Sequence, residues 1–232
     1  MYDWLKQALK TEYTPVRLLK ESDRGSVRVV RHNVTGRRFV LRCFTGNGEV
    51  YQKLLGYACP NLPVVYEAVA KGEENLVLEE LIQGDTLNFL LQGALFTPAE
   101  TRNIVIQLCR GLWALHSLGA VHRDIKPENI ILRGADAVLI DFDAARFHKP
   151  ELETDTRILG TTGFAAPEQY GLSQSDCRAD IYSVGILMNV MLTGEHPSKK
   201  LVAGKLGRVV QRCTQVNPKK RYQNVLRLME AL

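Results

Sequence analysis

The residues best suited to carry out chemistry lie in two short segments in the middle of the chain. Residues 122–129 include a carboxylate at Asp124, an ammonium group at Lys126 and an amide at Asn129, and Asp141 directly follows an apolar run. A carboxylate can accept the proton of an attacking hydroxyl, and carboxylate and amide oxygens can hold a magnesium ion beside phosphate groups. The types and spacing of these residues suit transfer of a phosphoryl group to a hydroxyl.

The segment from 122 to 129 resembles the catalytic loop of the protein kinase family. It matches the pattern H-R-D-x-x-x-x-N at every defined position. The resemblance implies that Asp124 accepts the hydroxyl proton and that Asn129 binds Mg²⁺ or Mn²⁺. Lys126 stands where the serine/threonine branch has a lysine that neutralises the transferring phosphate, so tyrosine specificity is disfavoured.

A second motif, at residues 141–143, resembles the family's D-F-G segment. It follows an apolar strand at 137–140, and by resemblance Asp141 is the principal Mg²⁺ ligand. Asp143 replaces the glycine, and aspartate tolerates a positive φ less readily than glycine does. We expect a conformational substitution that restricts flipping of this segment, with a second metal-binding carboxylate as the alternative.

Residues 160–168 resemble the end of a kinase activation segment and close on the family's A-P-E motif. The resemblance implies that Glu168 forms a buried ion pair with Arg221 and that Asp180 begins the central helix. These elements distinguish the chain from small-molecule phosphotransferases of the aminoglycoside type, which stay as an alternative. They favour a protein substrate.

The activation segment also contains candidate phosphorylation sites. Arg123 resembles a cation that awaits a phosphate on this segment. The candidates for autophosphorylation are Thr154, Thr156, Thr161 and Thr162. By resemblance Thr161 has a competing role, contact with the catalytic aspartate and lysine, so Thr154 or Thr156 is the better candidate for a switch.

The glycine-rich loop departs from the family. Residues 20–27 align with G-x-G-x-x-G-x-V but keep only Gly25 of its glycines. Ser22 could still form a tight turn and contact a phosphate through its hydroxyl, although it carries a side chain where the motif has none. The approach of this backbone to the phosphates is therefore less closely specified than in the family.

The lysine of the family's V-A-I-K motif is also replaced. Arg42 takes its place, and the resemblance implies that it pairs with Glu49 on the following helix and contacts the α- and β-phosphates of ATP. Two alternatives stay open. Arg42 is a surface residue on an edge strand, or Lys20 of the first strand substitutes for the missing lysine.

The adenine ring is expected between two lobes, by resemblance to the kinase hinge. Leu78 is then the gatekeeper, and Val27 and Val40 form the roof of the pocket. The backbone from Glu79 to Leu81 offers hydrogen bonds to the ring.

Hydrophobic periodicity divides the chain into a strand-rich part and a helix-rich part. Alternation predicts strands near 16–19, 27–30, 38–44, 63–70 and 76–81, and helical spacing predicts helices at 2–10 and 48–57. From Thr97 the period is helical, opened by a capping box with Glu100, and residues 181–192 form a buried core helix.

We therefore predict an α+β, bilobal protein kinase-like fold. The small N-lobe, about 12–78, is an antiparallel sheet with one helix, the hinge is 79–82, and the mainly helical C-lobe is about 83–232. Together they form a single kinase domain over 1–232. Because only residues 197–205 separate the central helix from the next helical pattern, the region of the docking helix αG is reduced.

Composition indicates a globular protein. The chain has 232 residues, of which 45% are hydrophobic and 24% charged. Five cysteines without metal-ligand spacing suit a reducing cytoplasm. The N-terminus does not read as a signal peptide, and no apolar run reaches the ~20 residues of a membrane span. A net charge of +5 is modest, so we interpret the basic residues near the C-terminus as a solvated face and expect no nucleic-acid partner.

These observations predict a compact bacterial-type serine/threonine protein kinase that binds ATP and Mg²⁺, phosphorylates a protein and autophosphorylates. The main alternative is a pseudokinase, a nucleotide-binding or scaffolding module, because the glycine-rich loop and Arg42 depart from the family. The sequence carries no prediction of the oligomeric state.

Overall fold

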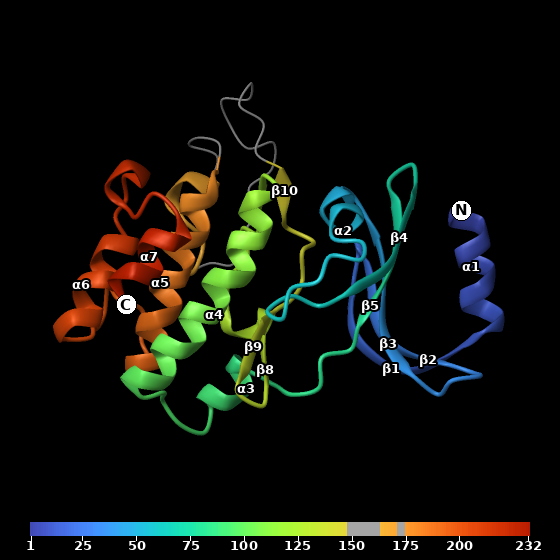
Figure 1. The fold of residues 1–232 in the computed structure, drawn as a ribbon, viewed down its shortest axis with the longest axis horizontal. Helices are drawn as coiled ribbons and strands as arrows, with labels where there is room; N and C mark the ends of the chain where they lie inside the picture. Colours follow the sequence, from blue (N-terminus) through green and yellow to red (C-terminus); the bar gives the residue numbers. More distant parts are fainter. Residues whose placement is uncertain (148–162, 171–174) are drawn as a thin grey trace. The chain divides into compact units, whose positions relative to one another are not determined.

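The computed structural model describes residues 1–147, 163–170 and 175–232. The chain forms two compact units, Met1–Ile82 and Gln83–Leu232. The first unit is built on a β-sheet and the second is mainly helical (Figure 1). The predicted α+β class is confirmed.

The first unit contains a five-stranded antiparallel sheet in the order β1-β2-β3-β5-β4. Its strands are β1 (Tyr13–Ser22), β2 (Gly25–His32), β3 (Arg38–Thr45), β4 (Val65–Lys71) and β5 (Glu74–Glu80). The strands include most of the predicted stretches, because β-branched and aromatic side chains alternate there between the two faces of a sheet.

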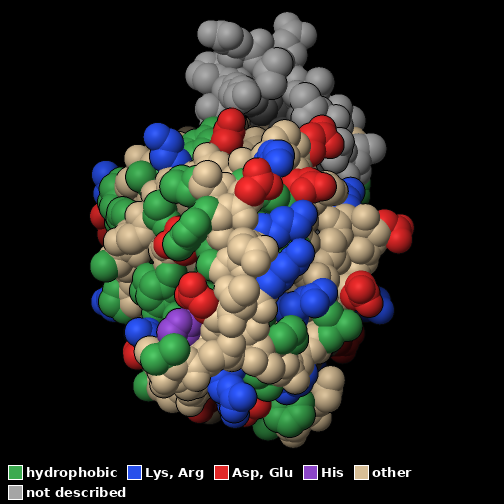
Figure 2. All heavy atoms as spheres, turned by 90° about the vertical axis from the view of Figure 1, so that its right-hand side faces the viewer, with side chains coloured by type: hydrophobic (Ala, Val, Ile, Leu, Met, Phe, Trp, Pro, Cys, Tyr) green, Lys and Arg blue, Asp and Glu red, His purple; other side chains and the backbone are tan. Residues whose placement is uncertain are grey.

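One face of this sheet is covered by α1 (Tyr2–Thr11), in blue at the right of Figure 1. Tyr2 and Leu5 of the helix pack with Val69 and Leu76 of the sheet in one buried cluster. A second buried cluster consists of Val30, Phe39, Leu41 and Leu78, with Leu9 of α1 against it. Figure 2 looks onto this side of the molecule and shows Lys and Arg side chains gathered in a band.

The opposite face of the sheet carries Arg42. The register pairs Val27 with Arg42, and Val40 with Glu79. Side chains that lie directly opposite one another on neighbouring strands point to the same face, so these four residues share it. Leu78 pairs with Leu41 and therefore points to the other face, under α1.

The helix after β3, α2 (Glu49–Lys53), is shorter than the predicted helix at 48–57. Its C-cap is Leu54, and Gly56 follows with a φ of 67°. A positive φ ends a right-handed helix and is a conformation that glycine adopts readily. Val50 and Tyr51 are buried, so the short helix still presents an apolar side to the sheet.

The second unit is built around α4 (Pro98–Ser117) and α5 (Cys177–Thr193). The predicted capping box of α4 is present: the Glu100 carboxylate accepts the N–H of Thr97 at 2.8 Å, and the Thr97 hydroxyl accepts the N–H of Glu100. The other elements are α3 (Leu87–Leu91), α6 (Gly204–Cys213), α7 (Val225–Ala231), β6 (Asp85–Thr86), β7 (Ala120–Val121), β8 (Ile130–Arg133), β9 (Asp136–Leu139) and β10 (Arg146–Phe147). In the described part of the chain, no helix combines the length and the apolar character that crossing a membrane requires.

The connection from α5 to α6, residues 194–203, contains no helix, as the predicted reduction of this region requires. The buried Asn189 of α5 holds it. Its Nδ2 donates to the carbonyls of Glu195 and Lys200, both at 2.7 Å, and its Oδ1 accepts the N–H of Val202 at 2.9 Å. One amide side chain thus satisfies backbone groups that regular structure would otherwise pair.

Candidate active site

Asp124, Lys126 and Asn129 lie together in the loop between β7 and β8. Nζ of Lys126 is 2.7 Å from Oδ2 of Asp124. Nδ2 of Asn129 donates to the same oxygen at 3.0 Å and to the Asp124 carbonyl at 2.8 Å. The side chains of Asp124 and Lys126 keep 17% and 20% of their surface exposed. A carboxylate that solvent can reach therefore has a cation and an amide against it.

Asp180 of α5 holds the backbone of this loop. Its Oδ1 accepts the N–H of Arg123 at 2.8 Å, and its Oδ2 accepts the N–H of His122 at 2.9 Å and Nε2–H of His116 at 2.8 Å. Complete burial acts to raise the pKa of Asp180, but the hydrogen bond from His116 and the neighbouring charges lower it below the ordinary value. The carboxylate therefore stays ionised and fixes two consecutive peptide groups.

Arg123 has a φ of 70°, an uncommon conformation for a residue with a side chain. A second buried residue, Gln169 in the turn Pro167–Tyr170, supports it. Nε2 of Gln169 donates to the Arg123 carbonyl at 2.7 Å, and its Oε1 accepts the N–H of Ala166 at 3.0 Å. Asp180 and Gln169 together hold this strained peptide in place from both of its sides.

The His122 ring connects the loop to the segment that contains Asp141. Nε2 lies 3.3 Å from the carbonyl of Ile140, Nδ1 accepts the N–H of Asp124 at 3.3 Å, and the ring meets Phe142 edge-on at 5.6 Å. These partners suit a neutral ring with its proton on Nε2. Burial lowers the pKa of His122 and favours the same neutral form, although three nearby carboxylates oppose the shift.

Asn129 and Asp141 are brought together by the backbone, because the N–H of Ile140 donates to the Asn129 carbonyl at 2.9 Å. Nδ2 of Asn129 is used by Asp124, which leaves its Oδ1 as the oxygen to offer a metal. One carboxylate and one amide oxygen form a donor set that suits Mg²⁺, which keeps several waters and phosphate oxygens as its other ligands. The two residues fit the ion expected from the sequence.

Asp143 stands at the position where the family has glycine. Among the described residues other than glycine, a positive φ occurs at Arg123 and Asp141. Asp143 therefore does not use the conformation that favours glycine. Its N–H donates to Oδ1 of Asp141 at 3.4 Å and its carbonyl accepts Nη1 of Arg146 at 3.1 Å.

Glu168 and Arg221 form a buried bidentate ion pair. Nη1 and Nη2 of Arg221 lie 2.6 and 2.8 Å from the two carboxylate oxygens of Glu168. The guanidinium also donates to three backbone carbonyls, those of Arg178, Gln215 and Val216. This pair ties the turn Pro167–Tyr170 to the segment before α7 and has a structural role.

The proposed phosphorylation sites Thr154, Thr156, Thr161 and Thr162 lie outside the residues that the structure describes. Arg123, their expected partner, is a buried residue with 4% of its surface exposed.

Arg42 and Glu79 form a buried ion pair within the first unit. Nε of Arg42 lies 2.6 Å from Oε1 of Glu79. Arg42 is 4% exposed and Glu79 2%. The guanidinium also lies near the ring of Tyr51, with 5.8 Å between Cζ and the ring centroid. This geometry corrects the interpretation of Arg42 as a surface residue.

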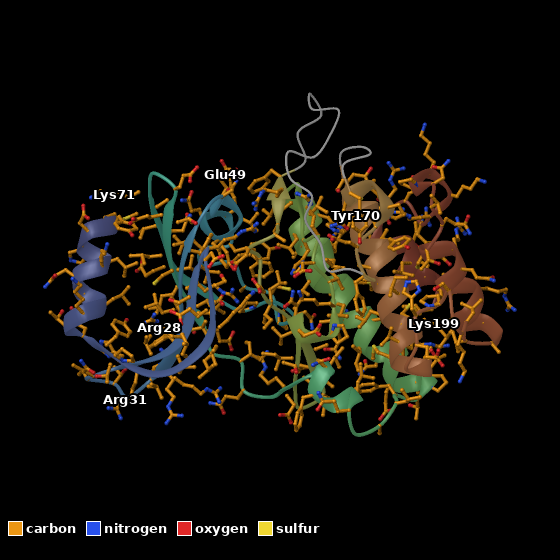
Figure 3. All side chains as sticks on the ribbon, turned by 180° about the vertical axis from the view of Figure 1, so that it is seen from behind. Arg28, Arg31, Glu49, Lys71, Tyr170 and Lys199 are labelled. Carbon is orange, nitrogen blue, oxygen red and sulfur yellow. The ribbon has the colours of Figure 1, made fainter. Side chains whose placement is uncertain are left out.

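Glu49, the expected partner of Arg42, lies elsewhere. It is exposed at the start of α2 (Figure 3). Its N–H donates to Oδ1 of Asn47 at 2.8 Å, and its Oε2 accepts Nδ2 of Asn47 at 3.2 Å. An acidic residue is favoured in the first turn of a helix by the partial positive charge there. The expected Arg42–Glu49 pair is therefore replaced by Arg42–Glu79.

Of the predicted adenine contacts, Val27 and Val40 share the sheet face that carries Arg42, and Leu78 does not. Leu78 is buried in the cluster covered by α1. The side chain on the Arg42 face at this end of β5 is Glu79. Leu81, one residue beyond β5, is partly buried.

Ser22 and Gly25 close the β1–β2 hairpin. Oγ of Ser22 lies 3.4 Å from the carbonyl oxygen of Gly25. Gly25 has a φ of 146°, and a Cβ atom there would clash with the carbonyl oxygen of Cys43 on β3. The close approach of β3 therefore requires glycine at this position, independently of any phosphate.

The sequence did not predict the contacts that four side chains make at these sites, those of His116, Gln169, Tyr51 and Glu79. Tyr51 and Gln169 are both completely buried. The available signal was alternation along β5, where Val77 and Glu79 share a face. An acid in such a position needs a cation, and Arg42 on the neighbouring strand offers one.

The family described as "Protein kinase domain" matches residues 25–225 of this chain. Serine/threonine-protein kinase PknL of Mycobacterium tuberculosis is 37% identical over 139 residues, which cover 59% of this chain and 35% of that protein. Probable serine/threonine-protein kinase PknB of Corynebacterium glutamicum is 35% identical over 126 residues, which cover 52% and 20%. Serine/threonine-protein kinase PknA of Nostoc sp. is 27% identical in an alignment that covers 98% of this chain and 48% of that protein. The chain spans less than half the length of each of these relatives.

Proposed function

The chain belongs to the protein kinase family, and we propose that it is a serine/threonine protein kinase that transfers the γ-phosphate of ATP to a protein hydroxyl. The observation that carries the proposal is the grouping of Lys126 and Asn129 around the carboxylate of Asp124. The names of the relatives, which are serine/threonine-protein kinases, support the choice of acceptor.

Asp124 is proposed to orient the attacking hydroxyl. The hydroxyl donates a hydrogen bond to the carboxylate, and the proton passes to Asp124 as the oxygen forms its bond to the γ-phosphorus. The bond from that phosphorus to the bridging oxygen breaks, and ADP leaves. Lys126, held beside the same carboxylate, neutralises charge on the transferring phosphate oxygens.

Asn129 and Asp141 are proposed to hold Mg²⁺, or Mn²⁺, through Oδ1 of the amide and through the carboxylate. When bound, the ion supplies positive charge to the phosphate groups. The residues of the chain supply the geometry. Asp124 orients the amide of Asn129, and the His122 ring supports the backbone just before Asp141.

The nucleotide-binding surface of the first unit is proposed to be the sheet face that carries Val27, Val40 and Arg42. The two valines offer apolar contact to the adenine ring, and the guanidinium offers charge to the α- and β-phosphates. The backbone from Glu79 to Leu81 offers hydrogen-bonding groups at the end of β5. We replace Leu78 by Glu79 as the side chain that faces the nucleotide, because Leu78 points to the other face.

The substrate is proposed to be a protein, and the chain itself to be one substrate through the threonines between 154 and 162. The buried Glu168–Arg221 pair supports this choice, because it anchors the end of the segment in which those threonines lie. The five cysteines are free thiols, which supports a cytoplasmic location.

A second candidate function is a pseudokinase that binds nucleotide without efficient transfer. The specific observation in its favour is that the Arg42 guanidinium, in place of lysine, is bound by a buried carboxylate. That contact reduces the positive charge available to the phosphates.

Incubation with γ-labelled ATP and Mg²⁺ or Mn²⁺ tests the proposal, with the chain itself and a generic basic protein as acceptors. The proposal predicts label on serine or threonine that disappears in Asp124→Asn. Nucleotide binding without any transfer would establish the pseudokinase instead, and label on sugars or antibiotics but not on protein would indicate a small-molecule phosphotransferase.

A further inference from the structure

We infer that Glu79, on the strand next to Arg42, is the positioning residue for the Arg42 guanidinium, and that Glu49 of α2 has no part in this. The inference rests on the proposed function for what Arg42 does, and on the geometry of the first unit for what holds it.

The contact from Glu79 is short and buried. Its Oε1 lies 2.6 Å from Nε of Arg42, and the two side chains are 3% and 5% exposed. A charge-assisted hydrogen bond shielded from water keeps much more of its strength than one in solvent. Glu49 is exposed and bound to Asn47. Of these two acids, the one that can set the position of Arg42 is therefore Glu79 on β5.

The pair is built into a rigid part of the sheet. β3 and β5 are paired over residues 39–45 and 74–80, with Val40 directly opposite Glu79 and Val77 directly opposite Arg42. Arg42 and Glu79 are thus diagonal neighbours on one face. The contact depends on a strand register rather than on the place of a helix, so a displacement of α2 does not break it.

Tyr51 is the contribution of α2 to this site. It is completely buried, lies near the Arg42 guanidinium and packs against Phe44 with ring centroids 5.6 Å apart. An aromatic ring near a guanidinium contributes a weak attraction and excludes water. The helix therefore shields the pair, and among its described acidic residues Glu49 does not contact Arg42.

This arrangement explains an arginine where the family has lysine. A guanidinium has five N–H donors in a fixed plane, so a carboxylate on Nε sets the orientation of the terminal N–H groups. Those groups are the ones that contact phosphates in a fork. A lysine has one charged nitrogen. It therefore cannot be oriented through one nitrogen while other nitrogens donate to phosphate oxygens.

The test compares two isosteric variants, Glu79→Gln and Glu49→Gln, with Glu73→Gln, an exposed acid in the turn between β4 and β5, as the matched control. Two quantities are measured: the steady-state KM and kcat for ATP, and the NMR resonance of the Arg42 Nε–H group. That resonance is identified as the arginine Nε–H signal that disappears in Arg42→Lys.

We expect Glu79→Gln to move the Arg42 signal and to raise KM for ATP by roughly ten- to hundredfold, the factor for loss of a charge-assisted hydrogen bond, with a smaller change in kcat. Glu49→Gln is expected to behave as Glu73→Gln does. Should Glu79→Gln fail to fold, Glu79→Asp keeps the charge and shortens the reach. It is expected to move the signal and to give an intermediate KM.

A Glu49→Gln variant that moves the Arg42 signal and raises KM as much as the Glu79 variants would overturn the inference. An Arg42 Nε–H resonance that keeps its wild-type position in both Glu79→Gln and Glu79→Asp would also overturn it. If the wild-type chain bound no nucleotide, the proposed function would fail, and the NMR comparison alone would still decide which acid holds Arg42.

Discussion

The two buried arginine–glutamate pairs of this chain are alike in burial, but only one of them was predicted from the motifs. Arg221 donates to Glu168 from both terminal nitrogens and also donates to three backbone carbonyls. Arg42 meets Glu79 through Nε. The Arg221 guanidinium therefore joins separate segments of the chain, whereas the Arg42 guanidinium is oriented by a carboxylate on Nε.

The same difference separates the two candidate functional regions. Around Asp124, the motif residues Lys126 and Asn129 contact the same carboxylate, because the loop is short and its anchors are buried in α5 and in the turn Pro167–Tyr170. Arg42 is paired with Glu79 of strand β5, whereas the family's pattern implied Glu49 of the helix α2. The loop around Asp124 thus stays close to its family's pattern, while Arg42, in the first unit, is held in another way.

Replacing the structural arginine should have the largest effect on stability. Arg221→Gln leaves the Glu168 carboxylate buried without its cation, so we expect a loss of about 3–5 kcal/mol in the free energy of unfolding. Urea denaturation measures it. Arg227→Gln, which removes the exposed Arg227–Glu230 pair, is the matched control and is expected to leave the midpoint unchanged. A similar midpoint for both variants would contradict the comparison.

Loosening the anchor of the catalytic loop should have the next largest effect. Asp180→Asn removes the charge that accepts N–H groups from His122, Arg123 and His116. We expect a loss of about 1.5–3 kcal/mol in the free energy of unfolding and a fall in kcat of at least roughly tenfold, with KM for ATP little changed.

Asp136→Asn, at an exposed acid that begins β9, controls for the change of charge in the Asp180 experiment. If Asp180→Asn lowered stability but kept full kcat, the loop would not need its strained conformation for transfer.

Acid should weaken the second unit through His122. Burial lowers the pKa of this ring in the folded state, so the unfolded state binds the proton more readily. Stability is therefore complete above the ordinary histidine pKa of about 6.5 and falls as the pH drops below it. The lowered pKa of Asp180 acts in the same direction at more acidic pH.

Denaturant titrations at pH 7.5 and 5.5 measure this dependence. His122→Gln is expected to flatten it and His196→Gln, whose ring is partly exposed, to leave it as in the wild type. If the free energy of unfolding fell equally between pH 7.5 and 5.5 in the wild type and in His122→Gln, protonation of the buried ring would not destabilise the folded state.

The parts of the fold that sequence predicts well are those with local causes. The capping box at Thr97 and Glu100, the period of α4, and the loop from His122 to Asn129 all depend on residues a few positions apart. Strand positions followed from alternation for the same reason. The early end of α2 also had a local signal, Gly56, but the prediction of a helix at 48–57 used hydrophobic spacing alone.

What sequence could not supply is the pairing of distant strands. Whether Leu78 or Glu79 faces Arg42 depends on the register of β3 with β5, and a shift of one residue exchanges the two faces. The expected Arg42–Glu49 pair failed because the family's pattern was extended to a helix that is here too short and begins at Glu49 itself. Likewise His116 and Gln169 gain their roles only when α4, α5 and the turn Pro167–Tyr170 meet the loop.

Transfer is proposed to depend on the loop that contains Asp124, and Arg42 is proposed to serve nucleotide binding. These two roles are separated by single-turnover transfer from ATP, measured over a range of ATP concentrations for the wild type, Asp124→Asn and Arg42→Gln. We expect Asp124→Asn to lower the maximal rate, reached at saturating ATP, by about 10²–10⁴-fold. Arg42→Gln is expected mainly to raise the ATP concentration that gives half of the maximal rate. A maximal rate that falls as far in Arg42→Gln as in Asp124→Asn would show that Arg42 acts in transfer itself, and a wild-type rate in Asp124→Asn would show that this carboxylate is not needed.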